Sequence, residues 1–230
     1  MTSLPSNVRV STHPCLKAKI SQLRSSSSHA RVVNALVHEI STILACEALA
    51  SGLTTKPGDT DTTPLGYTYT TDGISPTHIS LVPILRSGLS MVEAFQTLLP
   101  HSVPVHHLGL FREPSTLQPV EYYNNLPYHR PSSTGAETSA ASDLAILLDP
   151  VIATGGTASA AIQTLREWGV KKVILVSVVA SAAGVAHAAE EWTDGVQVLV
   201  GSVDGECDEQ GMIKPGLGDV GDRLFLTIGK

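Results

Sequence analysis

Residues 149–157 hold the clearest chemistry in the chain, because they combine a carboxylate, two hydroxyls and two adjacent glycines. They read Asp-Pro-Val-Ile-Ala-Thr-Gly-Gly-Thr and lie between an apolar run and a pattern typical of a helix. Adjacent glycines let backbone N–H groups face a ligand closely, and a helix N-terminus adds free N–H groups and a positive dipole end. Together these features predict a phosphate site that needs no basic side chain, with Asp149 beside it for sugar hydroxyls or a Mg²⁺ ion.

A purely structural explanation of Thr154 to Thr157 is a Gly-Gly turn followed by a threonine N-cap. The order of apolar strand, Asp149, Thr-Gly-Gly and helix favours the phosphate site over that turn. The segment lacks the Gly-x-Gly-x-x-Gly spacing of dinucleotide sites and the Gly-Lys-Ser/Thr of nucleoside-triphosphate loops. We therefore expect a phosphorylated ligand that is neither a dinucleotide nor the substrate of an ATPase.

Charged side chains in two other segments could complete such a site. Arg86 lies in Val-Pro-Ile-Leu-Arg-Ser-Gly-Leu, and its planar guanidinium suits two adjacent phosphates. It stands in a stretch with very few other charges, which argues against an ordinary surface arginine. Asp219 and Asp222 lie in the Gly/Pro-rich stretch 211–225, where turn formation alone would also explain them.

These residues are far apart in the sequence, so strands and helices must bring them together. The hydrophobic pattern predicts which segments form them. Short apolar runs alternate with helical spacing, which predicts an α/β fold with a mainly parallel sheet flanked by helices. The expected strands are 78–85, 103–111, 143–150, 172–180 and 196–203, and the expected helices are 30–50, 89–99, 157–168 and 182–192. In helix 89–99 the buried face is predicted to hold Leu89, Val92, Phe95 and Leu99. Ligands bind where parallel strands end, so the informative loops follow Leu85, Phe111, Asp149 and Val203.

The segments outside this pattern are expected to be loops. Residues 54–66 are rich in Thr, Pro, Gly and Asp and predict a surface loop, while the low-complexity stretch 131–142 predicts a mobile one. We expect one domain, with a helical segment and loop at 1–77 and an α/β core at 78–230. His106 and His107 lie in an expected strand without a metal spacing, so packing is their expected role.

Several segments resemble the uracil phosphoribosyltransferase family of type I phosphoribosyltransferases. Residues 149–157 resemble the family's loop for phosphoribosyl pyrophosphate (PRPP), Asp-Pro-Met-Leu-Ala-Thr-Gly-Gly-Ser, and residues 82–89 resemble its pyrophosphate loop. The stretch 211–225, Gly-Met-Ile-Lys-Pro-Gly-Leu-Gly-Asp-Val-Gly-Asp-Arg-Leu-Phe, is similar to a segment specific to the uracil enzymes. Residues 110–124 resemble an arm that covers the active site. The resemblance spans roughly residues 12–225. It implies an α/β fold of the type I phosphoribosyltransferase kind, with a hood arm over the active site at about 111–130.

The resemblance also assigns roles to individual residues. The residues it implies for catalysis are Arg86, Arg112, Asp149 and Asp219. The residues it implies for PRPP are Arg86, Arg112, Asp149, Pro150, Val151, Ile152, Ala153, Thr154, Gly155, Gly156, Thr157 and Asp219. The residues it implies for uracil are Met212, Ile213, Gly218, Asp219 and Val220. No protein residue is expected to bind a metal directly, because the Mg²⁺ ion would arrive with PRPP.

The activity implied is the conversion of uracil and PRPP to UMP and pyrophosphate in pyrimidine salvage. Met212, Asn125 and Cys46 depart from the family, which usually has Tyr, Lys and Tyr there. These departures leave two alternatives open: a non-catalytic PRPP or nucleotide sensor, and a phosphoribosyltransferase for another base. The resemblance further implies a homodimer or homotetramer and makes GTP a candidate effector.

Composition limits the classes of partner. The 230 residues are 42% hydrophobic and 16% charged, and their formal net charge is −6, which argues against disorder, nucleic-acid binding and an anionic membrane surface. The three cysteines, Cys15, Cys46 and Cys207, have neither metal nor disulfide spacing, and the N-terminus has no apolar stretch of signal-peptide length. The longest apolar run, 173–189, is shorter than the ~20 residues of a membrane span. We therefore expect a cytoplasmic protein.

Overall fold

A computed structural model describes residues 4–113, 116, 118–127 and 141–227, apart from the side chain of Arg112. The largest sheet has eight strands in the order β1-β10-β9-β7-β4-β5-β6, with β8 also pairing β9. Every strand pair in it is parallel except β5 with β6. These strands are β1 (Val8–Val10), β4 (Ile79–Leu85), β5 (Leu108–Arg112), β6 (Pro119–Asn124), β7 (Leu144–Leu148), β8 (Val151–Ile152), β9 (Lys172–Ser181) and β10 (Val196–Asp204). The predicted mainly parallel sheet is confirmed.

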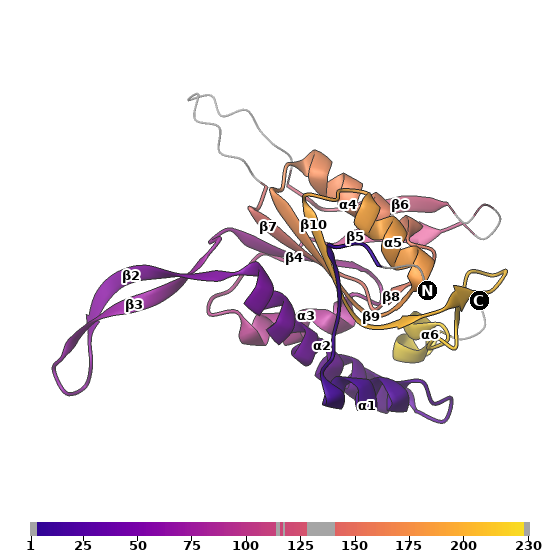
Figure 1. Ribbon diagram of the computed structural model, residues 1–230, viewed down its shortest axis with the longest axis horizontal. Helices are drawn as coiled ribbons and strands as arrows, with labels where there is room; N and C mark the ends of the chain where they lie inside the picture. The colour runs from indigo at the N-terminus through magenta and orange to yellow at the C-terminus, as the bar shows by residue number, and fades with distance from the viewer. Residues whose placement is uncertain (1–3, 114–115, 117, 128–140, 228–230) are drawn as a thin grey trace.

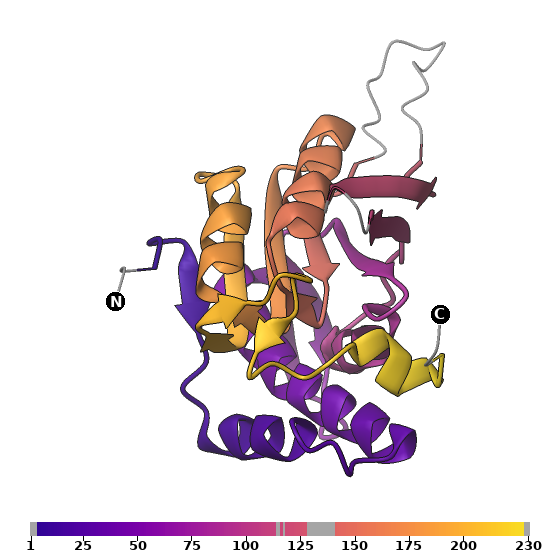
Figure 2. The same cartoon turned by 90° about the vertical axis from the view of Figure 1, so that its right-hand side faces the viewer.

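Helices cover both faces of this sheet (Figures 1 and 2). On one face lie α1 (Pro14–Leu23), α2 (Ala30–Gly52) and α3 (Leu89–Leu98), and on the other lie α4 (Gly156–Trp168) and α5 (Ala182–Glu190). The short helix α6 (Val220–Phe225) packs against α2. The observed layers are those predicted from the alternation of strands and helices.

The central strand β7 is buried on both sides, which explains why its sequence shows no polar alternation. Ile146 packs into a hydrophobic cluster with residues of α2 such as Ile40, whereas the next residue, Leu147, packs with Ile162 and Leu165 of α4. Both Ile146 and Leu147 are fully buried. The sheet therefore has two separate cores, one on each face.

Two predicted elements differ in detail from the observed ones. Helix α3 buries Met91, Ala94 and Phe95, but Leu89, expected on the buried face, is 40% exposed. Leu89 is the first residue of α3, so its side chain stands at the end of the helix rather than along its buried face. Strand β5 begins only at Leu108, because residues 103–107 make a single bridge to β4 at Val105.

The predicted loop at 54–66 is wrong, because this segment forms most of a hairpin. Strand β2 (Thr54–Thr62) pairs antiparallel with β3 (Thr68–Ser75), with a register irregularity between Pro57 and Thr60. Every residue of β2 is exposed, and the hairpin projects away from the sheet in Figure 1. The abundant threonines favour a strand, and the pairing satisfies the backbone without burying side chains. The predicted mobile loop falls mainly on residues 131–140, which lie outside the described part of the chain.

Helix α2 is the one described helix that is long and apolar enough to cross a membrane by length and composition. It packs against α1, α3, β9 and β10. Its buried residues are Val33, Leu36, Val37, Ile40, Ser41, Leu44, Ala45 and Ala48. Its apolar character thus matches its place in the core beneath the sheet.

Replacing Ile146 or Leu147 with alanine is expected to lower the free energy of unfolding by about 2–5 kcal/mol in each case. Each change removes packing on a different face of the sheet. Urea denaturation measures both, with Val32→Ala on the exposed side of α2 as the control, expected within about 0.5 kcal/mol of wild type. A loss in only one core variant would contradict burial on both faces.

Candidate active site

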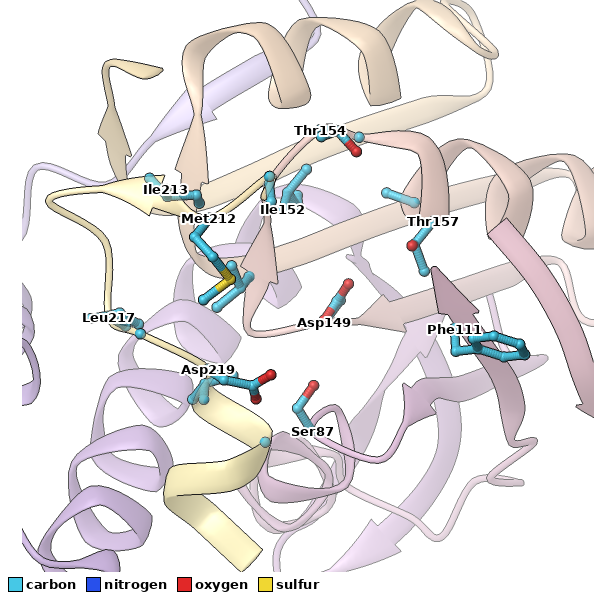
Figure 3. A pocket seen from close by; sticks show the side chains of 18 of the residues that line it. Ser87, Phe111, Asp149, Ile152, Thr154, Thr157, Met212, Ile213, Leu217 and Asp219 are labelled. Atoms are coloured by element: carbon cyan, nitrogen blue, oxygen red, sulfur yellow. The ribbon is translucent and has the colours of Figure 1, made fainter. Parts of the chain in front are cut away.

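A cavity of about 350 Å³ lies where β4, β5, β7 and β8 end. Four separate chain segments meet around it, and Figure 3 shows the side chains of Asp149, Thr157, Ser87 and Asp219 facing a common space. The predicted residues that line it are Arg86, Asp149, Val151, Ile152, Ala153, Thr154, Gly155, Thr157, Met212, Ile213, Gly218, Asp219 and Val220. The structure therefore brings the three predicted loops to one place.

Among the predicted residues that the structure describes, Pro150 and Gly156 do not line the cavity. The carbonyl of Pro150 accepts hydrogen bonds from Val178 and Val179, so this residue ties the loop to β9. Gly156 instead begins helix α4. Arg112 ends strand β5 opposite Pro119, but its side chain lies outside the described part of the structure.

The segment 153–157, here called the phosphate loop, turns directly into α4. Gly155 has a φ of 85°, a left-handed conformation that other residues rarely adopt. A Cβ atom at this position would also lie 2.4 Å from the carbonyl oxygen of Gly184. A glycine is therefore required here by both backbone angle and space, as the phosphate-site prediction needs.

Asp149 is the most perturbed carboxyl group in the cavity. It follows β7 directly and is only 8% exposed. Burial away from water disfavours the charged form and raises the pKa of Asp149 to about 7, against an opposing hydrogen bond from the backbone of Val151. The group can thus be neutral or ionised near neutral pH, depending on what occupies the cavity.

The Arg86 guanidinium is held by the end of the chain. Its Nη2 atom donates to the hydroxyl of Thr227 at 3.3 Å and lies 4.0 Å from a carboxylate oxygen of Asp222. The guanidinium carbon lies 5.7 Å from the centre of the Phe225 ring. Thr227 in turn donates to Asp222 at 2.5 Å. Asp222 thus has a function beyond turn formation, because it helps to place Arg86 at the cavity rim.

Asp219 serves both the turn and the cavity. Its carboxylate accepts a hydrogen bond from the backbone N–H of Asp222 at 3.0 Å and so caps the N-terminus of α6. The same side chain lines the cavity and faces Asp149 across it (Figure 3). The structural and the functional explanations of this residue are therefore compatible.

The segment 213–220, the predicted base loop, is clamped by arginine and aspartate residues that sequence reasoning missed as site residues. Arg24, the C-cap residue of α1, forms two charge-assisted hydrogen bonds with Asp204, at 2.6 and 2.7 Å, and donates to the carbonyl of Gly216 at 2.8 Å. Asp204 also accepts from the N–H of Gly216 at 3.0 Å. Arg223 donates to Leu217 at 2.7 Å. Two features of the sequence could have indicated these contacts: the apolar strand that ends at Asp204, and the Leu-Arg pair at 23–24.

Met212 closes the same side of the cavity. It precedes β12 (Ile213–Lys214), which pairs with β11 (Glu206–Cys207). Its backbone N–H donates to the Asp208 carboxylate at 2.9 Å, while its thioether points into the cavity in Figure 3. The thioether thus occupies the wall where the family usually has a tyrosine.

Phe111, in the segment predicted to form a hood arm, lines the cavity. The Phe111 and Tyr122 rings lie 6.0 Å apart, and Tyr122 is 55% exposed. Asn125 accepts from the His107 N–H at 2.6 Å and anchors the base of the arm. His106 packs edge-on against Trp168, which confirms its packing role. In the described part of the chain no three His, Cys, Asp or Glu residues gather as a metal site.

Replacing Asp149 with asparagine is expected to stabilise the protein increasingly as the pH rises. The folded pKa of about 7 lies above the unfolded value of 3.8, so the stability that the neutral carboxyl provides is complete below pH 4 and lost as the pH approaches 7. The variant should gain up to about 4 kcal/mol over wild type between pH 4 and pH 8. Urea midpoints measured across this range test it, and parallel curves for the two proteins would contradict it.

Replacing Arg24 with leucine is expected to lower the free energy of unfolding by about 2–4 kcal/mol, since the Asp204 carboxylate, 5% exposed, loses its cation. The double variant Arg24→Leu/Asp204→Leu removes both charges and should recover part of that loss. Urea denaturation of the two single variants and the double variant measures the coupling. Strictly additive losses would show that the pair does not interact.

Comparisons with known proteins agree with this geometry. The sequence model described as uracil phosphoribosyltransferase matches residues 10–227. The uracil phosphoribosyltransferase of Finegoldia magna is 39% identical over 222 residues, covering 96% of this chain and 99% of that protein. A Schizosaccharomyces pombe relative, urg2, whose name assigns it provisionally to the same enzymes, is 41% identical over 220 residues, or 96% of this chain and 90% of that one.

A solved structure shows the same fold. The AQ2163 protein of Aquifex aeolicus superposes with a TM-score of 0.83 at 30% identity, covering 96% of this chain and 98% of that one. The sequence match spans the phosphate loop, the pyrophosphate loop and the base loop, which together line one cavity. The chain belongs to the uracil phosphoribosyltransferase family.

Proposed function

We propose that the protein transfers the 5-phosphoribosyl group of PRPP to N1 of uracil, forming UMP and pyrophosphate. The observation that carries this proposal is the convergence of the phosphate loop, Arg86 and the base loop on one cavity, with Asp149 and Asp219 between them. A phosphate site, a pyrophosphate site and a base site are the three subsites that this reaction requires.

The phosphate loop would hold the 5′-phosphate of PRPP through backbone N–H groups, the hydroxyls of Thr154 and Thr157, and the start of α4. Arg86 also lines the cavity, and its guanidinium would bridge the oxygens of the pyrophosphate. We assign Arg112 of the hood arm to the same group. Pro150 and Gly156 would act by shaping the loop, since neither lines the cavity.

The chain's task in the reaction is to position the substrates and to stabilise charge. As pyrophosphate leaves, C1′ of the ribose becomes positively charged, and no covalent bond to the protein is needed. Asp149 would accept hydrogen bonds from the ribose hydroxyls. Those donors favour the ionised form of a carboxyl whose burial otherwise raises its pKa to about 7. Asp219 would lie between ribose and base.

The base loop would recognise uracil through backbone groups. Uracil has acceptors at O2 and O4 and a donor at N3, which backbone N–H and C=O groups can match. Cytosine carries a donor at position 4 and would leave a loop N–H unpaired. We assign this recognition to Ile213, Gly218, Asp219 and Val220, with the Met212 thioether covering one face of the ring.

Mg²⁺ would enter with PRPP rather than reside on the protein. The described residues offer no cluster of three ligating side chains, but the Asp149 and Asp219 carboxylates face the cavity, and oxygen ligands suit this ion. Bound to PRPP, the ion would neutralise charge on the departing pyrophosphate. The hood arm, with Phe111 at the cavity, would exclude water when it closes.

The proposal extends to the setting of the enzyme. Cys15, Cys46 and Cys207 are free thiols, which suits a reducing compartment, so we propose a cytoplasmic location. Family membership supports a homodimer or homotetramer and makes GTP a candidate effector. The net charge of −6 supports small-molecule substrates rather than nucleic acid or an anionic membrane.

The deciding experiment offers the purified protein PRPP, Mg²⁺ and a panel of uracil, cytosine, orotate and purines, with and without GTP. Conversion of labelled uracil to UMP is the expected result. A better substrate than uracil would identify a phosphoribosyltransferase for another base. Binding of PRPP or UMP without product would identify a sensor instead.

Arg86→Ala is expected to lower kcat/KM for PRPP at least tenfold, or roughly 1.4 kcal/mol, because a neutral side chain cannot stabilise the leaving pyrophosphate. Steady-state kinetics with labelled uracil measures the effect. Arg166→Ala is the matched control, because Arg166 is exposed in the last turn of α4, at the end of that helix opposite the phosphate loop. Equal kinetics in Arg86→Ala and wild type would remove Arg86 from the pyrophosphate site.

A further inference from the structure

The back of the phosphate loop is bonded to the beginning of helix α5. The hydroxyl of Ser181 donates to the carbonyl oxygen of Ala153 at 2.6 Å. The same hydroxyl accepts from the N–H of Gly184 at 2.8 Å and so caps α5. Ser181 is 1% exposed, so this bond is shielded from water. One side chain thus joins the helix start to the loop backbone.

His187 makes a second bond to the next residue of the loop. Its Nδ1 atom lies 3.1 Å from the carbonyl oxygen of Thr154. A carbonyl oxygen can only accept, so Nδ1 must carry the proton in this contact. Ser181 and His187 therefore hold two consecutive loop carbonyls from the same side.

The two backbones are also packed too closely for side chains. A Cβ atom on Gly184 would lie 2.0 Å from the carbonyl oxygen of Ala153, and one on Gly155 would lie 3.0 Å from the Cβ of His187. The loop therefore has little space to move toward α5. Contacts and hydrogen bonds act together to fix its orientation.

This orientation decides where the loop's donors point. The Ala153–Thr154 and Thr154–Gly155 peptide bonds are trans, and across a trans peptide the C=O and the following N–H point in opposite directions. Carbonyls turned back toward α5 leave the N–H groups of Thr154 and Gly155 turned toward the cavity that these residues line. Within the described chain, neither N–H has a hydrogen-bond partner in the protein.

We propose that Ser181 and His187 are positioning residues that aim the Thr154 and Gly155 N–H groups at the substrate phosphate. The proposal rests on the proposed function, because it takes the 5′-phosphate of PRPP as the group received. Neither side chain is placed to touch the reacting atoms, since both bond to the far side of the loop. His187 gives the cleaner test, because Ser181 also caps α5.

The test compares His187→Ala with His187→Asn, whose side-chain amide N–H can replace the Nδ1 donor. Losing the His187–Thr154 bond should weaken the contact between the loop N–H groups and the 5′-phosphate. This contact is equally strong in the ground and transition states, because the 5′-phosphate does not react. KM for PRPP should therefore rise about three- to tenfold with kcat nearly constant. KM for uracil should stay within twofold. His187→Asn should restore most of the PRPP affinity. Glu190→Ala, an exposed change at the end of α5, is the control.

Calorimetric PRPP binding by the same variants separates this proposal from the proposed function. Wild type that binds PRPP without forming UMP would contradict the activity, while a three- to tenfold weaker Kd in His187→Ala would still support the positioning role. Unchanged PRPP affinity in His187→Ala would overturn it. Equal losses in His187→Ala and His187→Asn, or a matching rise in KM for uracil, would also overturn it, because the donor would then not be the cause.

Discussion

Backbone N–H groups can hold a phosphate only if several of them point the same way, and the structure depends on this constraint. Peptide geometry means that the carbonyls must then point away, toward groups that donate hydrogen bonds to them. Here Ser181, which caps α5, and His187 of α5 donate to two loop carbonyls. The loop and α5 lie so close together that Gly155 and Gly184 cannot carry side chains. The chain order is β7, β8, phosphate loop, α4, β9 and α5, and this arrangement places the start of α5 behind the loop.

The same constraint explains how a chain of net charge −6 can bind a polyanion. N–H groups and hydroxyls carry no net charge, so the phosphate site adds none to the protein. The cavity nevertheless contains two carboxylates, Asp149 and Asp219, and burial makes ionisation of Asp149 unfavourable near neutral pH. A folded chain that keeps this buried carboxyl has lower stability at high pH, in exchange for a polar group where we propose that the ribose binds.

Sequence patterns predicted those parts of the site that depend on residues close together in the chain. The unbroken apolar run of β7 indicated burial on both faces, and Thr-Gly-Gly before a helix indicated the phosphate loop. Contacts between distant residues were not predictable: Arg24 and Asp204 are 180 positions apart, and His187 and Thr154 are 33 apart. The hairpin of β2 and β3 was missed for a related reason, because its Pro and Gly residues indicate a loop and only pairing across the turn reveals strands.

The base loop shows why such distant contacts matter for function. A segment rich in Gly and Pro has few side chains with which to pack, so its shape must be imposed from outside. Arg24 and Asp204 bond both the N–H and the C=O of Gly216, and Arg223 bonds Leu217. Arg24, just after α1 and far from the loop in sequence, therefore helps to fix the shape in which the loop presents its backbone groups. If this loop binds the base as proposed, discrimination between pyrimidines that differ by one donor depends on a fixed loop shape, since a mobile loop could rotate to satisfy either base.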